Sequence, residues 1–188
     1  MTFRKVRYGE VSIKEIEQLT ELFHTAYSNN EKLGIHFKAA TISSEEVEDH
    51  WLGQPMFTEK ADGKIVTTAS LRLPWSKNPS PFALPHLGWV ATHPDYQGRS
   101  LARMLIEEVI DEFVIKKLRA PAITLGTALE HPWLIKAYEK LGFVYLSEKQ
   151  LFSDHKTIYM IKILDKKALL NVNDKELQDL IKENVNEF

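Results

Sequence analysis

Residues 93–103 read His-Pro-Asp-Tyr-Gln-Gly-Arg-Ser-Leu-Ala-Arg, a composition that suits an anion-binding turn. They follow an apolar strand expected at 87–92 and open a long helix. Small side chains leave the backbone N–H groups of the turn accessible, and the first N–H groups of a helix have no partner inside it. The helix dipole favours negative charge at this end, so a phosphate or pyrophosphate is the expected ligand. The small residues are Gly98, Ser100 and Ala102, and the positive charges are Arg99 and Arg103.

The order Gln-x-x-Ser-x-Ala, from Gln97 to Ala102, resembles the acyl-CoA pyrophosphate loop of the GNAT superfamily of N-acetyltransferases. The pattern of that family is Gln/Arg-x-x-Gly-x-Gly/Ala. Further along the chain, Tyr-Glu-Lys-Leu-Gly-Phe at 138–143 resembles the point where a helix of the same family leads into a strand. Two such elements in the correct order are more specific than either alone. The resemblance covers residues 3–164.

Ser100 departs from the family pattern, which usually has glycine at this position. Serine is still small, and its hydroxyl can bond a phosphate oxygen. Either the backbone does not need a positive φ there, or the loop is slightly strained. We expect the first alternative, an unstrained helical backbone, because the position begins the first turn of the helix.

The resemblance implies that acetyl-CoA is the acyl donor and assigns residues to its binding. In the family, two central strands, here 87–92 and 123–127, splay apart so that backbone groups bond the pantetheine arm. His131 lies seven residues before Tyr138, where the family often has an asparagine that bonds this arm, and an imidazole can supply a similar bond. The implied cofactor-binding residues are Val90, Ala91, Thr92, Gln97, Gly98, Arg99, Ser100, Leu101, Ala102, Arg103 and His131.

Tyr138 is the candidate catalytic residue, as a general acid that protonates the departing CoA thiolate in direct transfer to an amine. A phenol with an ordinary pKa near 10 is protonated at neutral pH and can donate this proton. The alternative is that Tyr138 only packs its helix against the sheet. Arg103 also has an alternative role, because it lies four residues before Glu107 and suits an exposed ion pair.

No residue stands out as the general base that must take a proton from the attacking ammonium. His86, beside the strand that lines the acceptor side, and Glu59, in a predicted hairpin, are two open candidates. The other histidines have no spacing typical of a metal site, and the chain has no cysteine, so neither thiolate catalysis nor a disulfide is available. We expect no metal cofactor.

Local patterns predict the elements around these residues. A strand at 3–8 precedes a helix that begins with a capping box, Ser12 to Glu15, and ends near Tyr27. Residues 31–42 suit a loop or short helix, and in the family they lie over the acceptor site. A second helix runs from about 43 to 52. The later elements are a hairpin of 56–61 and 64–73 around Asp62-Gly63, helices at about 101–114, 132–140 and 173–181, and strands at 123–127, 143–146 and 157–164.

Half of the chain's eight prolines lie between these elements, in residues 74–85. Such a stretch is neither a strand nor a helix. It is either a plain surface crossover or a loop that contacts the substrate.

Composition limits the class of protein. The chain has 188 residues, of which 44% are hydrophobic, and a net charge of −2. These values suit one buried core and give no basic footprint for nucleic acid. No stretch has the ~18 apolar residues of a membrane span, and the N-terminus has no signal-peptide pattern. We therefore expect a cytoplasmic protein that binds neither membrane nor nucleic acid, and a homodimer is compatible with this expectation.

These elements and the resemblance predict an α/β fold: a GNAT-like mixed, mostly antiparallel central sheet with helices on both faces and splayed central strands. Residues 1–164 would form the single domain and 165–188 its C-terminal helical extension. The expected function is transfer of an acetyl group from acetyl-CoA to a primary amine on a small molecule or peptide. The alternative is a non-catalytic acyl-CoA-binding or regulatory module.

Overall fold

The computed structural model describes residues 13–28, 38–151 and 156–185. The expected strand at 3–8, Ser12 of the expected capping box and residues 31–37 lie outside this part of the chain. Among the described residues, no helix combines the length and the apolar character needed to cross a membrane.

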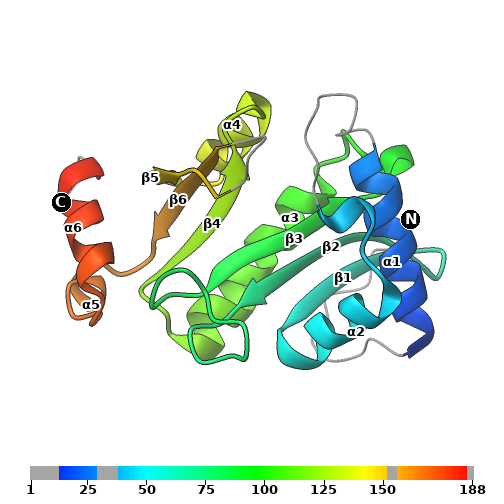
Figure 1. Cartoon of the computed structure of the whole chain (residues 1–188), viewed down its shortest axis with the longest axis horizontal. Coiled ribbons are helices and arrows are strands. Elements are labelled where there is room, and N and C mark those ends of the chain that lie inside the picture. The colour runs from blue at the N-terminus through cyan, green and yellow to red at the C-terminus, as the bar shows by residue number, and fades with distance from the viewer. Residues whose placement is uncertain (1–12, 29–37, 152–155, 186–188) are drawn as a thin grey trace. The chain divides into compact units, whose positions relative to one another are not determined.

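Figure 1 shows the order of the helices and strands along the chain, from two α-helices at the start through the strands to α5 and α6 at the end. Within the described residues, six strands form a sheet in the order β1-β2-β3-β4-β6-β5. The strands are β1 (Met56–Ala61), β2 (Lys64–Arg72), β3 (His86–Thr92), β4 (Ala122–Ala128), β5 (Val144–Lys149) and β6 (Thr157–Ile163). The α-helices are α1 (Ile13–Tyr27), α2 (Ser44–Gly53), α3 (Leu101–Glu108), α4 (Pro132–Lys140), α5 (Lys166–Leu169) and α6 (Lys175–Asn184). The other helical segments are η2 (Lys38–Ala40), η3 (Pro94–Tyr96) and η4 (Val109–Leu118).

The predicted hairpin is confirmed, since β1 pairs antiparallel with β2. Asp62 and Gly63 have φ values of 51° and 81°, as a type I′ turn requires. The capping box at the start of α2 is also present, between Ser43 and Glu46. The predicted α/β class is therefore confirmed, with a mostly antiparallel sheet and one parallel pair, β3 with β4.

The chain divides into two compact units, and the first comprises Met1–Leu71 and Trp89–Val109. Within it, α1 and α2 pack on one face of the strands, where the cluster includes Phe23, Val47 and Ile65. On β2 the next residue, Val66, points to the opposite face and packs with Leu101 of α3. Helices thus cover both faces of the sheet in this unit.

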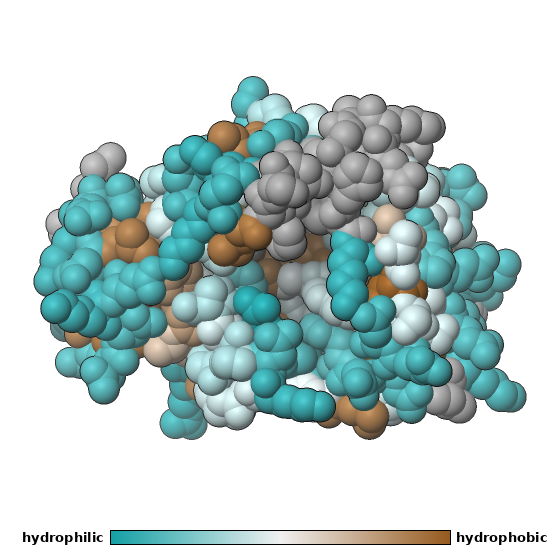
Figure 2. All heavy atoms as spheres, in the orientation of Figure 1, coloured by the Kyte–Doolittle hydropathy of each residue, from teal (hydrophilic) through white to brown (hydrophobic). Residues whose placement is uncertain are grey.

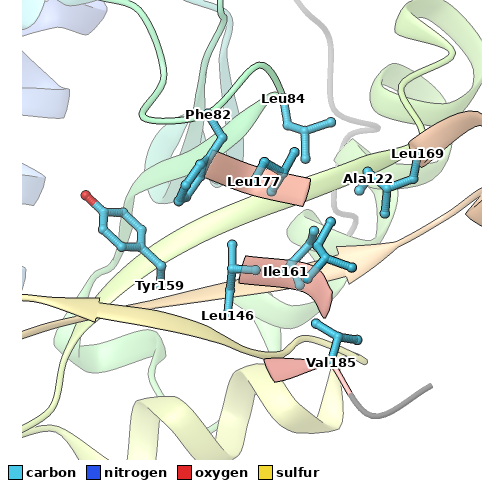
Figure 3. Close-up of a cluster of buried hydrophobic side chains, with 10 residues drawn as sticks. Phe82, Leu84, Ala122, Leu146, Tyr159, Ile161, Leu169, Leu177 and Val185 are labelled. Carbon is cyan, nitrogen blue, oxygen red and sulfur yellow. The ribbon is translucent and has the colours of Figure 1, made fainter. Parts of the chain in front are cut away.

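The second unit comprises Arg72–Gly88 and Ile110–Phe188. Here β6 pairs antiparallel with both β4 and β5, and the start of β3 runs parallel to β4, with His86 opposite Thr124. Figure 3 shows the apolar cluster of this unit, in which α5, α6 and the proline-rich segment supply side chains such as Leu169, Leu177 and Phe82. The outer surface of α6 is hydrophilic (Figure 2).

The helix after residues 93–100 differs from the expected uniform α-helix. Its α-helical part, α3, is followed directly by a π-helical segment, η4. Apolar pairs at 109–110 and 113–114 are buried. Because pairs spaced by four residues lie on one face of either helix type, the sequence pattern does not distinguish them. The short helix α5 was not predicted.

Candidate functional site

The loop between β3 and α3 belongs to the first unit and has the backbone of an anion-binding turn. After Thr92 the chain makes the short helix η3 and turns at Gly98, where φ is 74°. The helix α3 then starts, and its first carbonyl acceptor is that of Ser100, 3.0 Å from the Met104 nitrogen. No backbone N–H group from Gly98 to Arg103 donates a hydrogen bond to a described residue. Successive unpartnered N–H groups at a helix start can bind a phosphate.

Ser100 adopts the left-handed conformation, with φ 60° and ψ 17°. The expectation of an unstrained helical backbone at this position was wrong. Two positive φ values, at Gly98 and Ser100, turn the loop into α3, and at the second the chain has no glycine to absorb the strain. The Ser100 side chain does not cap the helix, so its hydroxyl gives no compensation there.

Three side chains of the loop are held by local contacts. The Gln97 amide donates to the Thr92 carbonyl at 3.3 Å and so joins the end of β3 to the loop. The Arg99 guanidinium donates to the Asp95 carbonyl at 3.0 Å and lies 5.0 Å from the ring centroid of Tyr96. Arg103 is exposed and forms the alternative ion pair with Glu107, at 3.8 Å. Arg99 therefore keeps its positive charge on the loop, whereas the charge of Arg103 is paired with that of Glu107.

The end of β3 shows which of its backbone groups face the neighbouring strand. The nitrogen of His93 donates to Val66 of β2 at 2.9 Å, and the Ala91 carbonyl accepts from the Thr67 hydroxyl at 2.9 Å. Since backbone groups alternate along a strand, those of Val90 and Thr92 face away from β2. The Val90 carbonyl accepts a hydrogen bond from the Tyr27 hydroxyl at 2.8 Å.

Tyr138 belongs to the second unit and lies near the end of α4. Its carbonyl accepts from the nitrogens of Leu141 and Phe143, at 3.0 and 3.1 Å, and Gly142 has a φ of 85°. This arrangement fixes the end of the helix. The half-buried ring meets that of Phe143 edge-on, with centroids 6.1 Å apart.

The Tyr138 hydroxyl makes no hydrogen bond to any residue that the structure describes. Burial raises the pKa of this phenol to about 12. The group is therefore protonated at neutral pH and has a proton to donate, as the general-acid hypothesis requires. His131, also in this unit, is 2% exposed at the start of α4, with its ring 4.7 Å from that of Trp133.

The two candidate bases lie in different environments. Burial and the nearby charge of Arg72 lower the pKa of His86 to about 3, so this imidazole is neutral and only weakly basic at pH 7. Its Nδ1 lies 2.9 Å from the Thr124 hydroxyl. Glu59 is 4% exposed, and its Oε2 has no hydrogen-bond partner among the described residues. Burial and the charge of Glu108 raise the pKa of Glu59, which makes it the stronger base.

The structure also reveals residues that the sequence analysis did not single out. Trp89 in the first unit has a φ of 51°, and its ring stacks on that of His50 with centroids 3.7 Å apart. A bulky residue with positive φ in a strand is unusual, and no sequence signal indicates it.

Arg72 is half-buried in the second unit. The sequence carries a signal for this burial, because Arg72 lies between two leucines, Leu71 and Leu73. Within the described ranges, no group of side chains is arranged to hold a metal ion.

Comparison with known proteins places the chain in a family. The family model described as Acetyltransferase (GNAT) family matches residues 16–143. The chain belongs to this family and is an N-acetyltransferase, not the alternative non-catalytic module.

Two relatives come from Bacillus subtilis (strain 168). The chain is 37% identical over 160 residues to an S-(2-succino)cysteine N-acetyltransferase. The aligned region covers 85% of this chain and 97% of that protein. It is 28% identical over 141 residues to an S-alkylcysteine N-acetyltransferase, and this aligned region covers 74% of this chain and 79% of that protein. Among solved structures, YncA from Salmonella typhimurium with its cofactor acetyl-CoA has a TM-score of 0.66 at 18% identity, covering 88% of this chain and 96% of that one. This likeness supports the fold.

Proposed function

We propose that the protein transfers the acetyl group of acetyl-CoA to the α-amine of an S-substituted cysteine. The observation that carries the proposal is the run of unpartnered N–H groups from Gly98 to Arg103, in a chain of the GNAT family. The acceptor class is supported by the activities of the two relatives, both of which are N-acetyltransferases of cysteine derivatives. The first relative is matched over nearly its full length.

In this proposal the loop binds the pyrophosphate of the donor. The N–H groups at the start of α3 donate to its oxygens, while Arg99 and Arg103 supply positive charge. Backbone groups of Val90, Ala91 and Thr92 bond the amides of the pantetheine arm, with Val90 and Thr92 best oriented because their groups face away from β2. Gln97, Ser100, Leu101 and Ala102 shape the turn, and His131 contacts the arm.

The reaction is direct attack on the thioester. The amine nitrogen forms the new bond to the acetyl carbon, the carbon–sulfur bond breaks, and Tyr138 gives its proton to the departing thiolate. The attacking nitrogen loses one proton to a base, directly or through water. Glu59 is the better candidate for this base because its pKa is raised. The pKa of His86 is lowered, which makes this imidazole too weak a base for the role. No metal takes part in this scheme.

Three further features belong to the proposal. Residues 165–188 form part of the same domain as residues 1–164, which is supported by Leu177 and Ile181 of α6 packing in the cluster with Leu146 of β5. A cytoplasmic location and a homodimer stay predictions.

The test is an acetyl-transfer assay with a panel of amines and acetyl-CoA, followed by mass spectrometry of the products. The panel contains S-methylcysteine, S-(2-succino)cysteine, lysine, spermidine, glucosamine and a peptide with a free N-terminus. We expect N-acetylation of the two cysteine derivatives with the highest kcat/KM. Preference for a polyamine, an amino sugar or the peptide would refute the proposed acceptor class.

A further inference from the structure

Arg72, at the end of β2, carries a half-buried positive charge. Its Nε is shielded from solvent and has no hydrogen-bond partner within the described part of the chain. No carboxylate there forms an ion pair with the guanidinium. Burial lowers the pKa of the group, but arginine stays charged at physiological pH. A charge that is partly removed from water and has no counterion is costly, which makes Arg72 a candidate for binding an anion.

The charge of Arg72 influences two polar side chains of the same unit, His86 and Tyr159. Tyr159 of β6 is buried, and its ring centroid is 5.9 Å from that of His86. The charge of Arg72 acts on both groups, lowering the pKa of His86 and opposing the rise that burial causes in the pKa of Tyr159. We call Arg72 and this pair of contacting rings, His86 and Tyr159, the Arg72 cluster.

Gly126 lies opposite Tyr159 in the pairing of β4 with β6, and it leaves this part of the sheet surface without a side chain. A Cβ atom at this position would lie 3.6 Å from the Tyr159 ring, 3.7 Å from His86 Nε2 and 3.3 Å from a methyl group of Thr157. These atoms converge over the glycine. Figure 3 shows that the Tyr159 hydroxyl points away from the apolar cluster of Leu146 and Ile161. This hydroxyl makes no hydrogen bond to a described residue.

The other charges near Tyr159 do not neutralise Arg72. Glu176 of α6 and Lys149 of β5 both influence the tyrosine, but they pair with each other at 2.5 Å. His86 is neutral, so it neither neutralises Arg72 nor adds a second positive charge. The Arg72 cluster thus combines one uncompensated cation with one hydroxyl donor, the groups that recognise a carboxylate.

We propose that Arg72 and the Tyr159 hydroxyl bind a carboxylate of the acceptor substrate, an assignment that rests on the proposed function. Every S-substituted cysteine carries an α-carboxylate on the carbon that holds the reacting amine, and a succinyl substituent adds two more. A guanidinium that binds one of these groups would orient the acceptor and select acidic amino acids over simple amines. The negative ligand would at the same time compensate the half-buried charge of Arg72.

The test compares acceptors that differ in their carboxylates, in the wild type and in Arg72→Met. S-methylcysteine has only the α-carboxylate, S-methylcysteinamide has none, and S-(2-succino)cysteamine has only the succinyl pair. Arg72→Met should lower kcat/KM for the carboxylate-bearing acceptor on the order of 10²-fold and for the carboxamide by less than about threefold. Intrinsic differences in amine reactivity cancel, because each acceptor is compared between two enzymes. Tyr159→Phe should lower the same value by about three- to tenfold.

A loss with S-methylcysteine assigns the site to the α-carboxylate, and a loss with S-(2-succino)cysteamine assigns it to the substituent. Equal losses on the acid and the carboxamide would overturn the proposal. The exposed arginine Arg119 provides the matched control, because Arg119→Met removes the same charge outside the cluster and should leave all values unchanged.

Thermal unfolding of the ligand-free protein gives a second readout. Removal of an uncompensated, half-buried charge should keep or raise the Tm of Arg72→Met, whereas a structural role for the guanidinium would lower it. Inactivity of the wild type on all acceptors would refute the proposed function instead. In that case calorimetry with S-methylcysteine and its carboxamide tests the carboxylate site by itself. Binding of the acid alone that is lost in Arg72→Met would support the site. Equal binding of both compounds, or no binding of either, would contradict it.

Discussion

Ser100→Gly should stabilise the protein, because Ser100 holds a left-handed backbone that glycine adopts without strain. A non-glycine residue in this conformation costs about 1–2 kcal/mol, and glycine loses about 0.4–1 kcal/mol through the greater freedom of the unfolded chain. The net gain is then roughly 0.5–1 kcal/mol. For a chain of this size, such a gain raises the Tm by about 1–4 °C.

The assay is denaturant unfolding of the two proteins without ligand, checked by thermal melts. Ser44→Gly is the matched control, because Ser44 is exposed in the first turn of α2, where glycine weakens the helix. We expect a higher midpoint for Ser100→Gly and a lower one for Ser44→Gly. A lower or unchanged midpoint for Ser100→Gly would refute the strain argument. The affinity for acetyl-CoA should stay within about tenfold, or about 1.4 kcal/mol.

Two further substitutions test the site. Gly98→Glu should abolish acetyl-CoA binding in calorimetry, because it places a carboxylate beside the unpartnered N–H groups and a side chain at a φ of 74°; retained affinity would place the anion site elsewhere. Glu59→Gln should raise the unfolding midpoint at pH 7 but not at pH 4. Because the pKa of Glu59 is raised in the folded state, its protonated form stabilises the wild-type protein. This stabilisation is fully present below the ordinary glutamate pKa of 4.5 and is lost as the pH rises through the folded-state pKa. An equal effect at both pH values would contradict this burial argument.

Local rules were sufficient for much of the fold. Asp62-Gly63 predicts the hairpin because a type I′ turn needs two positive φ values. Pro132 and Gly142 bound α4 because each residue has a fixed place at a helix end. The loop from Gln97 to Arg103 could be predicted as a candidate anion-binding turn because it combines small residues with arginines directly before an apolar helix.

The failures have tertiary causes. The left-handed Ser100 depends on the direction in which α3 leaves the loop, which no single residue encodes. The contact of His86 with Tyr159 depends on strand pairing between segments far apart in the chain. Sequence patterns assign each residue to a strand and a face, but they do not say which side chains from different strands meet.

The role of Tyr138 is tested most directly by single-turnover acetyl transfer from acetyl-CoA to S-methylcysteine, in the wild type and in Tyr138→Phe. The substitution removes one hydroxyl and keeps the ring that contacts Phe143, so the packing of α4 is retained. General-acid assistance is typically worth about 10²–10⁴-fold in rate, whereas a lost neutral hydrogen bond is worth only about 0.5–1.5 kcal/mol. We predict a rate lower by at least about 10²-fold with nearly unchanged affinity for acetyl-CoA. Transfer at the wild-type rate would contradict the account and leave Tyr138 as a packing residue.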